Sequence, residues 1–395
     1  MKREKNFGIS GERLKYGLVG GGPGSFIAAV HRTGIDFTRA ADLVAGCFSR
    51  DSVKNRTAAL EFGISNDRTY STFDEMAKRE AARDDGIDFA VIATPNNTHY
   101  AASRAFLEND INVSCDKPLC FTVEEALELA SLARDKGLLF MVTYAYTGYP
   151  LIHHARELVR SGQLGAIRVV MCEYPQGWLS DRTEDSGNLQ AKWREDPAQA
   201  GIAGCVGDIG THVENLAHTV TGLEIESLSA TLATFVEGRT LEDNAMITVR
   251  YKGGAVGHYW PSQVAIGHEN SLAIRVYGSE ASIEWEQEKP NVMRMMKKGQ
   301  PPMILTRGGP GLGRAAARWT RIHAGHPEGA FEAWANIYEA FCNSLKRHIK
   351  GQPSDDLEYF PTVIDGMRGV KFIHDCVKSS KADSAWVNGA SQYCV

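Results

Sequence analysis

A glycine-rich segment near the start of the chain constrains the fold more than any other feature of the sequence. An apolar run at residues 16–19 precedes Gly20-Gly21-Gly22-Pro23-Gly24-Ser25, and a helical pattern follows at residues 26–32. A strand, a glycine turn and a helix in this order let a pyrophosphate approach backbone N–H groups at the helix N-terminus. Glycines also form ordinary tight turns, so the segment alone does not separate a structural turn from a dinucleotide site.

The residues that follow favour the dinucleotide interpretation. Gly20 and Gly22 match the first two glycines of the fingerprint, whereas the third is displaced and Ala28 is the nearest small residue. Further strands are expected at residues 42–48, 88–93, 111–115 and 138–143, with helical segments between them. This alternation predicts an α/β fold with a doubly wound parallel sheet. We therefore expect Gly20, Gly22, Pro23 and Gly24 to contact a dinucleotide.

The pattern changes after residue 148. A helix is expected near residues 151–161, and residues 165–290 are rich in β-strand patterns, with strands at 167–171, 227–236, 245–251 and 255–260. The Gly-, Pro- and Arg-rich stretch 289–325 suggests a long surface excursion, and helices are expected at 331–349 and 362–379. We divide the chain into a flexible arm (1–13), a dinucleotide-binding domain (14–148) and an α+β domain (149–395).

Composition excludes several classes of protein. The 395 residues are too many for one ordinary core, and a net charge of −5 without a long run of one sign argues against a nucleic-acid partner. No apolar segment has the length of a signal peptide or of a membrane span. The eight cysteines form no CxxC pair, which argues against structural zinc and a disulfide framework. We expect a cytoplasmic protein with reduced thiols and no metal.

The residues after the second strand bear on cofactor choice. An acid there would bind the ribose 2′-hydroxyl of NAD, whereas an arginine accommodates the 2′-phosphate of NADP. The sequence has Phe48-Ser49-Arg50-Asp51 at this point. Ser49 and Arg50 favour NADP slightly, and Asp51 keeps NAD open if the turn is shifted by two residues.

Three residues are candidates for the chemistry. Asp208 and His212, in Gly207-Asp208-Ile209-Gly210-Thr211-His212, would share one helix face, where the acid could orient a histidine base. Lys117, held before Pro118 at a strand end, could donate a hydrogen bond to a substrate oxygen whose charge changes. Simpler explanations exist for each residue: a helix cap for Asp208, a structural role for His212 and a solvated surface position for Lys117.

Two further segments have open interpretations. Trp193-Arg194 stands in an expected loop, either as a buried tryptophan beside a solvated arginine or as a contact to cofactor or substrate. His326, followed by Pro327 and a helix, either lines a substrate pocket or belongs to a capping loop.

Together these residues resemble the Gfo/Idh/MocA oxidoreductase family, which includes glucose–fructose oxidoreductase and inositol dehydrogenases. The resemblance rests on Gly20 to Ala28, on Thr94-Pro95-Asn96-Asn97-Thr98-His99, on Asp116-Lys117-Pro118 and on Trp193-Arg194 upstream of Asp208 and His212. It covers roughly residues 14–380. It implies an N-terminal Rossmann domain and a C-terminal domain with a large open, mostly antiparallel sheet that often serves oligomerisation, so we expect a homodimer or homotetramer.

The resemblance also implies roles for individual residues. Lys117, Asp208 and His212 would be catalytic. The cofactor would contact the glycine turn (Gly20, Gly22, Pro23 and Gly24), Ser49 and Arg50, and also Thr94, Pro95, Asn96, His99, Asp116, Lys117, Trp193 and Arg194. Asp116 replaces the family's usual glutamate. Tyr146 stands in a segment where many relatives have asparagine or arginine, so its expected substrate contact is not carried over from the family.

We therefore expect an NAD(P)-dependent enzyme that transfers a hydride between the cofactor and a secondary hydroxyl of a sugar, sugar derivative or cyclitol. His212 would take the hydroxyl proton, Lys117 would stabilise the alkoxide, and Asp208 would hold His212. Two alternatives remain open: an NAD-dependent glycosidase that uses transient oxidation, and a non-catalytic dinucleotide-sensing regulator. A zinc polyol dehydrogenase is disfavoured because no Cys/His ligand cluster is visible.

Overall fold

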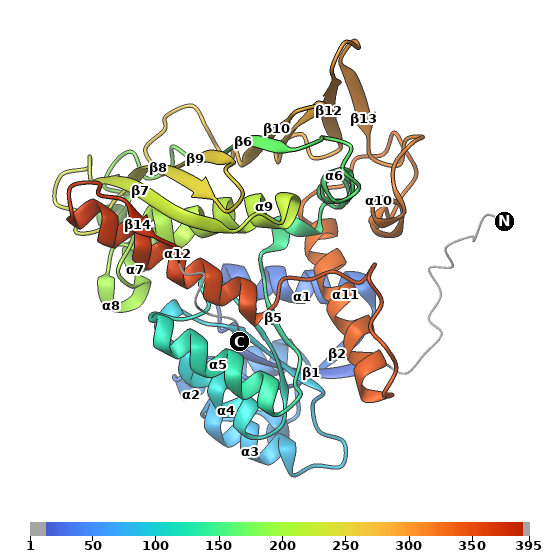
Figure 1. Cartoon of the computed structure of the whole chain (residues 1–395). Coiled ribbons are helices and arrows are strands. Elements are labelled where there is room, and N and C mark those ends of the chain that lie inside the picture. Colours follow the sequence, from blue (N-terminus) through green and yellow to red (C-terminus); the bar gives the residue numbers. More distant parts are fainter. Residues whose placement is uncertain (1–12, 390–395) are drawn as a thin grey trace.

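A computed structural model describes residues 13–389, apart from the side chain of Leu189. The flexible arm that we expected at residues 1–13 lies almost wholly outside the described residues. Within the described residues, the strands form a five-stranded sheet and a nine-stranded sheet. In Figure 1 the nine-stranded sheet lies above and the five-stranded sheet below, with helices between and around them.

The first sheet confirms the expected Rossmann architecture. Its strands are β1 (Leu14–Gly20), β2 (Ala41–Cys47), β3 (Phe89–Ala93), β4 (Asn112–Cys115) and β5 (Phe140–Val142), all parallel in the order β2-β1-β3-β4-β5. The intervening helices are α1 (Phe26–Thr38), α2 (Ser52–Glu61), α3 (Phe73–Ala81), α4 (His99–Glu108) and α5 (Val123–Asp135). Every residue of β3 is buried, as expected for a sheet covered on both faces.

The second sheet is mostly antiparallel, as expected. Its strands are β6 (Ile167–Pro175), β7 (Ile225–Ala233), β8 (Asn244–Tyr251), β9 (Val256–Ser262), β10 (Ala273–Gly278), β11 (Ala281–Glu286), β12 (Val292–Lys297), β13 (Met303–Thr306) and β14 (Val387–Asn388). The order is β13-β12-β11-β10-β6-β9-β8-β7-β14, and within this sheet only β6 and β9 pair in parallel among the described strands.

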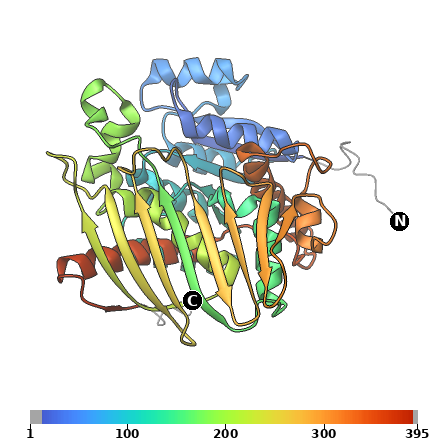
Figure 2. The same cartoon turned by 90° about the horizontal axis from the view of Figure 1, so that it is seen from above.

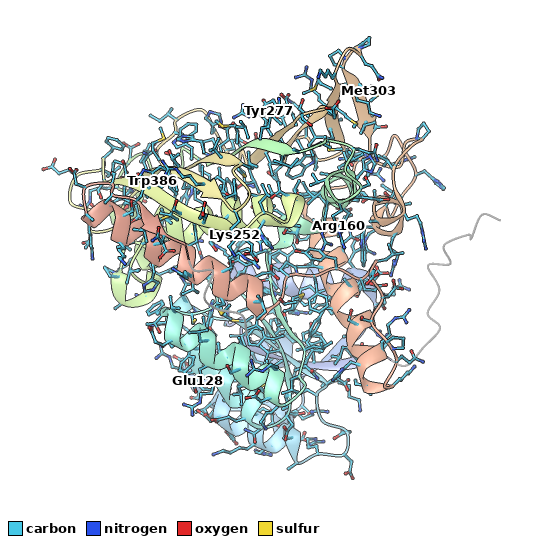
Figure 3. The ribbon with its side chains drawn as sticks, in the orientation of Figure 1. Glu128, Arg160, Lys252, Tyr277, Met303 and Trp386 are labelled. Atoms are coloured by element: carbon cyan, nitrogen blue, oxygen red, sulfur yellow. The ribbon has the colours of Figure 1, made fainter. Side chains whose placement is uncertain are left out.

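Helices cover one face of this sheet and leave the other uncovered. The helices α6 (Pro150–Arg160), α9 (Thr211–Thr221) and α12 (Val363–Lys381) pack their apolar residues against the sheet in one buried cluster. Figure 2 shows the opposite face without any covering helix. Tyr277 and Met303 lie on the part of the molecule formed by this sheet, far from Glu128 on α5 (Figure 3).

Two late segments differ from the sequence expectation. Residues 289–325 do not form only a surface excursion, because they contain β12, β13 and the short helix α10 (Arg314–Trp319). The helix α11 (Ala330–Ile349), expected as part of the second domain, returns to the first sheet, where Phe341 contacts Phe89 with ring centroids 5.2 Å apart. Ile337, Tyr338 and Leu345 of α11 complete the core beside β1 and β3.

No helix between residues 13 and 389 combines the length and the apolar character needed to cross a membrane.

Candidate active site

A cavity of about 660 Å³ lies between the carboxyl ends of the first sheet's strands and one end of the second sheet. Parallel sheets gather ligands at this edge, so the position agrees with the expected site. From the first domain the lining includes residues from the start of α1, Thr94, Pro95, Asn96, Asp116, Lys117 and Thr143. Tyr146, just after β5, also lines it, and from the rest of the chain it includes Tyr174, Gln176, Trp178, Gln190, Trp193, Arg194, Asp208, His212, Asn270, Gln287, Phe331 and Trp334.

The glycine turn beside this cavity is shaped for a close backbone approach. Gly20 and Gly21 have φ angles of 94° and 89°, which residues with a side chain rarely adopt. A Cβ atom on Gly20 would lie 2.3 Å from the Ala93 carbonyl oxygen, whereas Gly24 has open space around it. Ser25 begins α1 without a side-chain cap, and the first turn contains no acid. The turn therefore leaves amide groups free for an anion and fits the pyrophosphate of a dinucleotide.

The end of β2 lies against this turn. A Cβ atom on Gly22 would lie 3.1 Å from the Phe48 carbonyl oxygen and 3.4 Å from the Cβ atom of Ser49. Arg50 is exposed, and the Asp51 carboxylate caps α2 by accepting hydrogen bonds from the backbone N–H groups of Val53 and Lys54. These bonds lower the pKa of Asp51, with that from Lys54 contributing most, so the turn carries a fixed negative charge.

The turn after β3 brings three of its four predicted cofactor residues to the cavity, and His99 is the exception. Thr94, Pro95 and Asn96 line the cavity, but the His99 ring is fully buried beneath it. Its two nitrogens lie 2.8 Å from the Pro118 carbonyl oxygen and 2.9 Å from that of Thr94. His99 therefore joins the turn after β3 to the turn after β4, and it holds the cavity wall instead of contacting the cavity.

Lys117, Asp208 and Arg194 form one ionic cluster across the two domains. Lys117 Nζ donates to the Asp208 carbonyl oxygen at 2.7 Å and to Oδ1 at 2.9 Å, while Arg194 Nε donates to Oδ2 at 2.8 Å. Gln263 Nε2 adds a third side-chain donor at 2.9 Å. Burial alone would raise the pKa of Asp208, but the charges of Arg194 and Lys117 outweigh it and hold that pKa well below the ordinary range.

These contacts correct the expected partnership of Asp208 and His212. Asp208 lies in a π-helical turn (Val206–Gly210) that precedes α9, and His212 is the second residue of α9. Both residues line the cavity, but among the described side chains the Asp208 carboxylate is hydrogen-bonded to Lys117, Arg194 and Gln263, and no hydrogen bond joins it to His212. π-turns of this kind occur frequently at functional sites.

His212 is held by aromatic rings. Its ring contacts those of Tyr146, Tyr144 and Tyr174 at centroid distances of 4.8, 5.6 and 6.1 Å. Burial, reinforced by the nearby charge of Lys117, lowers the pKa of His212 to about 3. The imidazole is therefore uncharged near neutral pH and can accept a proton.

The remaining predicted residues divide into two groups. Trp193 and Arg194 line the cavity, at the end of the short helix α7 (Leu189–Arg194) instead of in a loop. The Arg194 guanidinium lies over the Trp193 ring, 4.3 Å from its centroid. His326 is exposed and does not line the cavity, so the alternative of a capping loop describes its position better than a substrate contact.

Asp116, which lines the cavity, is held by contacts that include two residues sequence reasoning missed, Thr143 and His31. Its Oδ1 accepts from the backbone N–H of Lys117 at 2.7 Å and from Thr143 Oγ1 at 3.1 Å, and Oδ2 lies 3.8 Å from His31 Nε2. His31, fully buried on α1, is also hydrogen-bonded to the hydroxyl of Tyr338 from α11. Burial would raise the pKa of Asp116, but His31 and Lys117 hold it below the ordinary range, so the carboxylate stays charged.

One wall of the cavity consists of uncharged hydrogen-bonding side chains. Tyr146 and Tyr174 share a hydrogen bond, and Asn270 links both phenols to Gln176 and Gln287. Burial raises the pKa of Tyr174 well above its ordinary value, so this phenol keeps its proton. Of these five residues only Tyr146 was a sequence candidate. The others stand at or just beyond strand ends, and no sequence rule marks them.

Comparison with known proteins assigns the family. Residues 14–144 match the model of an oxidoreductase family with an NAD-binding Rossmann fold, and residues 152–284 match the GFO/IDH/MocA C-terminal domain. The chain belongs to the GFO/IDH/MocA family. This result confirms the resemblance seen in the sequence, and it makes the chain an NAD-binding oxidoreductase.

Several members of the GFO/IDH/MocA family are similar over most of the chain. An uncharacterized oxidoreductase of Bacillus subtilis (strain 168), YfiI, is 36% identical over 389 residues, which are 96% of this chain and 99% of that protein. An inositol dehydrogenase homolog from Azotobacter vinelandii, solved with NAD+, is 38% identical with a TM-score of 0.91 over 95% of this chain and 97% of its own. An inositol dehydrogenase homolog from Azotobacter vinelandii, solved with NADH and myo-inositol, is 37% identical with a TM-score of 0.88 over 95% of this chain and 98% of its own.

A more distant member is levoglucosan dehydrogenase of Pseudarthrobacter phenanthrenivorans. It is 29% identical over 261 residues, which are 60% of this chain and 63% of that protein.

Proposed function

We propose that this GFO/IDH/MocA protein is a dehydrogenase that uses NAD to oxidise a secondary hydroxyl of an uncharged cyclitol or sugar. One observation carries the proposal: an uncharged histidine and a lysine ammonium face one cavity, and one wall of that cavity is polar but uncharged. A proton acceptor and a cation at the same oxygen are what alcohol oxidation requires.

The cofactor would lie along the first sheet. The glycine turn at Gly20, Gly22, Pro23 and Gly24 would hold the pyrophosphate, with Thr94, Pro95, Asn96 and Asp116 lining the path into the cavity. When bound, NAD+ supplies the hydride acceptor for conversion of a secondary alcohol into a ketone, with release of one proton. Trp193 and Arg194 would close the cavity from the side of the second domain.

Lys117 would bind the reacting oxygen. An ammonium group has three N–H donors, and Asp208 accepts two of them through its carbonyl oxygen and Oδ1. The third donor would remain for the substrate hydroxyl, where it stabilises the negative charge that develops as the proton leaves. In this proposal Asp208 fixes the position and charge of Lys117.

His212 would take the hydroxyl proton. Its ring is held by three tyrosines at the cavity and is uncharged near neutral pH, so one of its nitrogens is free of a proton. A neutral imidazole is a suitable acceptor, and in the reverse reaction the imidazolium would return the proton to the ketone oxygen.

The substrate class follows from the uncharged side chains of the cavity wall. Tyr146, Tyr174, Gln176, Asn270 and Gln287 offer hydrogen bonds without a charge, which suits several ring hydroxyls better than a carboxylate or phosphate. Relatives of this chain support the same class, since one was solved with NADH and myo-inositol and another is a levoglucosan dehydrogenase.

For the cofactor we propose NAD in place of the slight preference for NADP that Ser49 and Arg50 suggested. The charged Asp51 carboxylate at the end of β2 would repel a 2′-phosphate, whereas it would tolerate a 2′-hydroxyl. The inositol dehydrogenase homolog of similar sequence was solved with NAD+ and with NADH, which supports this choice.

A substrate panel tests the proposal. Cyclitols, aldoses and uncharged glycosides are incubated with the protein and NAD+ or NADP+, and the absorbance of the reduced nicotinamide is followed. We expect reduction with at least one cyclitol or sugar, faster with NAD+ than with NADP+. Cleavage of a glycoside without accumulation of reduced cofactor would instead support the transient-oxidation alternative, and an inactive protein that binds NAD+ would support a sensor.

We further propose that copies of the chain assemble through the uncovered face of the nine-stranded sheet into a homodimer or homotetramer, and that the protein works in the cytoplasm. The face combines outward apolar side chains such as Met246 and Val256 with ion pairs such as Arg275–Glu173. The seven cysteines among the described residues are buried free thiols, which suits a reducing compartment.

A further inference from the structure

Asn270 lies at the centre of the uncharged wall of the cavity. It stands three residues before β10, in the loop after β9, and its backbone N–H donates to Glu288 Oε1 at 2.9 Å. The same glutamate accepts from Ser271 Oγ at 2.9 Å through its other oxygen. This anchoring holds the Asn270 side chain between Tyr146 and Tyr174, which both line the cavity.

All four hydrogen-bonding positions of the Asn270 amide are used. Oδ1 accepts from the Tyr174 hydroxyl at 2.6 Å and from Gln176 Nε2 at 2.8 Å. Nδ2 donates to the Tyr146 hydroxyl oxygen at 3.3 Å and to Gln287 Oε1 at 3.2 Å. An asparagine amide has two donors and two acceptor positions, so the orientation of this side chain is fully determined by its neighbours.

This arrangement fixes the direction of the hydrogen bond between Tyr146 and Tyr174, whose hydroxyl oxygens are 2.5 Å apart. Tyr174 has a single hydroxyl hydrogen and gives it to Asn270, so the hydrogen between the phenols must come from Tyr146. Both hydroxyl hydrogens are then committed inside the wall. Toward the cavity the two phenols can only accept hydrogen bonds.

The Tyr146 oxygen still has one acceptor position after its bonds with Tyr174 and Asn270. The Tyr146 ring also contacts the ring of His212, with centroids 4.8 Å apart. An acceptor therefore lies beside the group to which we assign proton removal.

We propose that Asn270 sets the polarity of this wall, so that Tyr146 accepts a hydrogen bond from a second substrate hydroxyl next to the one that reacts. The inference rests on the proposed function and deepens it: the substrate is a vicinal diol, and a neighbouring group that cannot donate is selected against. Asn270 is a positioning residue here, since it acts through the two tyrosines.

Three small probes separate these possibilities without knowledge of the natural substrate. They are trans-cyclohexane-1,2-diol, cyclohexanol and trans-2-fluorocyclohexanol, in which the neighbouring group is a donor, absent, or an acceptor that cannot donate. Their dissociation constants for the NAD+-loaded protein are measured by quenching of tryptophan fluorescence. We expect the diol to bind about threefold to tenfold more tightly than cyclohexanol, the range of one net hydrogen bond. The fluoroalcohol should bind more weakly than cyclohexanol, because fluorine would face an oxygen lone pair.

Substitutions at the wall test the cause of this ranking. Asn270→Ala frees the hydroxyl hydrogen of Tyr174, and we expect the fluoroalcohol to bind at least as tightly as cyclohexanol in that variant. Asn270→Asp is the matched control, since its carboxylate still accepts the hydroxyl hydrogen of Tyr174, so Tyr146 remains the donor between the phenols and the wild-type ranking is kept. Tyr146→Phe should abolish the advantage of the diol over cyclohexanol, and it keeps the test decisive if Asn270→Ala does not fold.

The outcomes separate this inference from the proposed function. Equal binding of the three probes by the wild-type protein, tight binding of the fluoroalcohol, or no binding of any probe would overturn the inference even if the panel identifies an oxidised polyol. The expected ranking with no oxidation of any polyol would retain the wall and overturn the dehydrogenase.

Discussion

At His212 the same surroundings that hold the ring also set its charge. Burial among Tyr144, Tyr146 and Tyr174 disfavours the imidazolium, and the ammonium of Lys117 disfavours it further. An ordinary histidine gains its proton near pH 6.5, whereas His212, with a pKa of about 3, remains neutral well below that value. A fall in pH through 6.5 should therefore leave this base ready to act.

We predict that the ring resonances of His212, identified by their loss in His212→Ala, do not shift between pH 8 and about pH 5, because the histidine pKa lies well below the ordinary value. A titration midpoint near pH 6.5 would contradict this prediction.

The variant His212→Ala should lower turnover by about 10²–10⁴ if His212 is the general base. His258→Ala, on the uncovered face of the second sheet, serves as the control and should keep wild-type turnover.

Single residues were predicted from the sequence only as far as local spacing allows. Asp208 and His212 were recognised because they stand four residues apart, and both do line the cavity. The predicted pairing was wrong because Asp208 is hydrogen-bonded to Lys117, Arg194 and Gln263. These residues lie in segments that only the tertiary fold brings together. His31 was not among the sequence candidates for the same reason, since its contacts with Asp116 and Tyr338 join segments that are distant along the chain.

Among the secondary-structure elements, the junction of α11 with the turn at Ala145–Gly148 is unusually close. A Cβ atom on Gly148 would lie 2.1 Å from the Ala333 carbonyl oxygen, and the Gly148 carbonyl accepts from Asn336 Nδ2 at 2.8 Å. Both groups are buried, so the α11 backbone has to move if a methyl group is added.

We predict that Gly148→Ala destabilises the protein by about 1–3 kcal/mol, the usual cost of overpacking a buried contact. The measurement is the free energy of unfolding in denaturant. Gly329→Ala, at the start of the same helix, should change it by less than about 0.5 kcal/mol, because a Cβ atom there meets only Glu332 Oε2 at 3.8 Å. Equal effects of the two substitutions would show that the junction is not as tight as described.

The elements themselves were predicted best where their hydrophobic pattern was strong. The strands of the first sheet and the helices α11 and α12 were placed to within a few residues. Residues 289–325 were misjudged because their glycines and prolines were given more weight than the alternation in β12, where Met293 and Met295 are buried and Arg294 pairs with Glu284. That alternation was a usable signal for a strand.

For the molecule as a whole, the uncovered sheet face determines how copies can associate. Val169 and Met171 of the central strand β6 point to this face, since the residues between and after them, Val170 and Cys172, belong to the core. A large sheet face with both apolar and paired charged side chains is suited to a self-complementary interface.

We predict a homodimer or homotetramer by light scattering, and a shift toward smaller species in Met171→Glu, because a charge would be buried in the interface without a partner. Leu60→Glu, which adds the same charge at a side chain 78% exposed on α2, should leave the assembly unchanged. A monomeric wild-type protein, or equal behaviour of both variants, would contradict assembly through this face.

The return of α11 to the first sheet has a consequence for biosynthesis. A ribosome finishes the five strands of that sheet by residue 142, but the α11 residues that complete the core around Tyr16 and Phe89 are made only after residue 330. About half of the polypeptide therefore emerges while part of the apolar core of the nascent N-terminal domain still lacks its last helix. Completion of the cofactor domain is thus a late event in translation, and until then the incomplete core makes the nascent chain prone to aggregation.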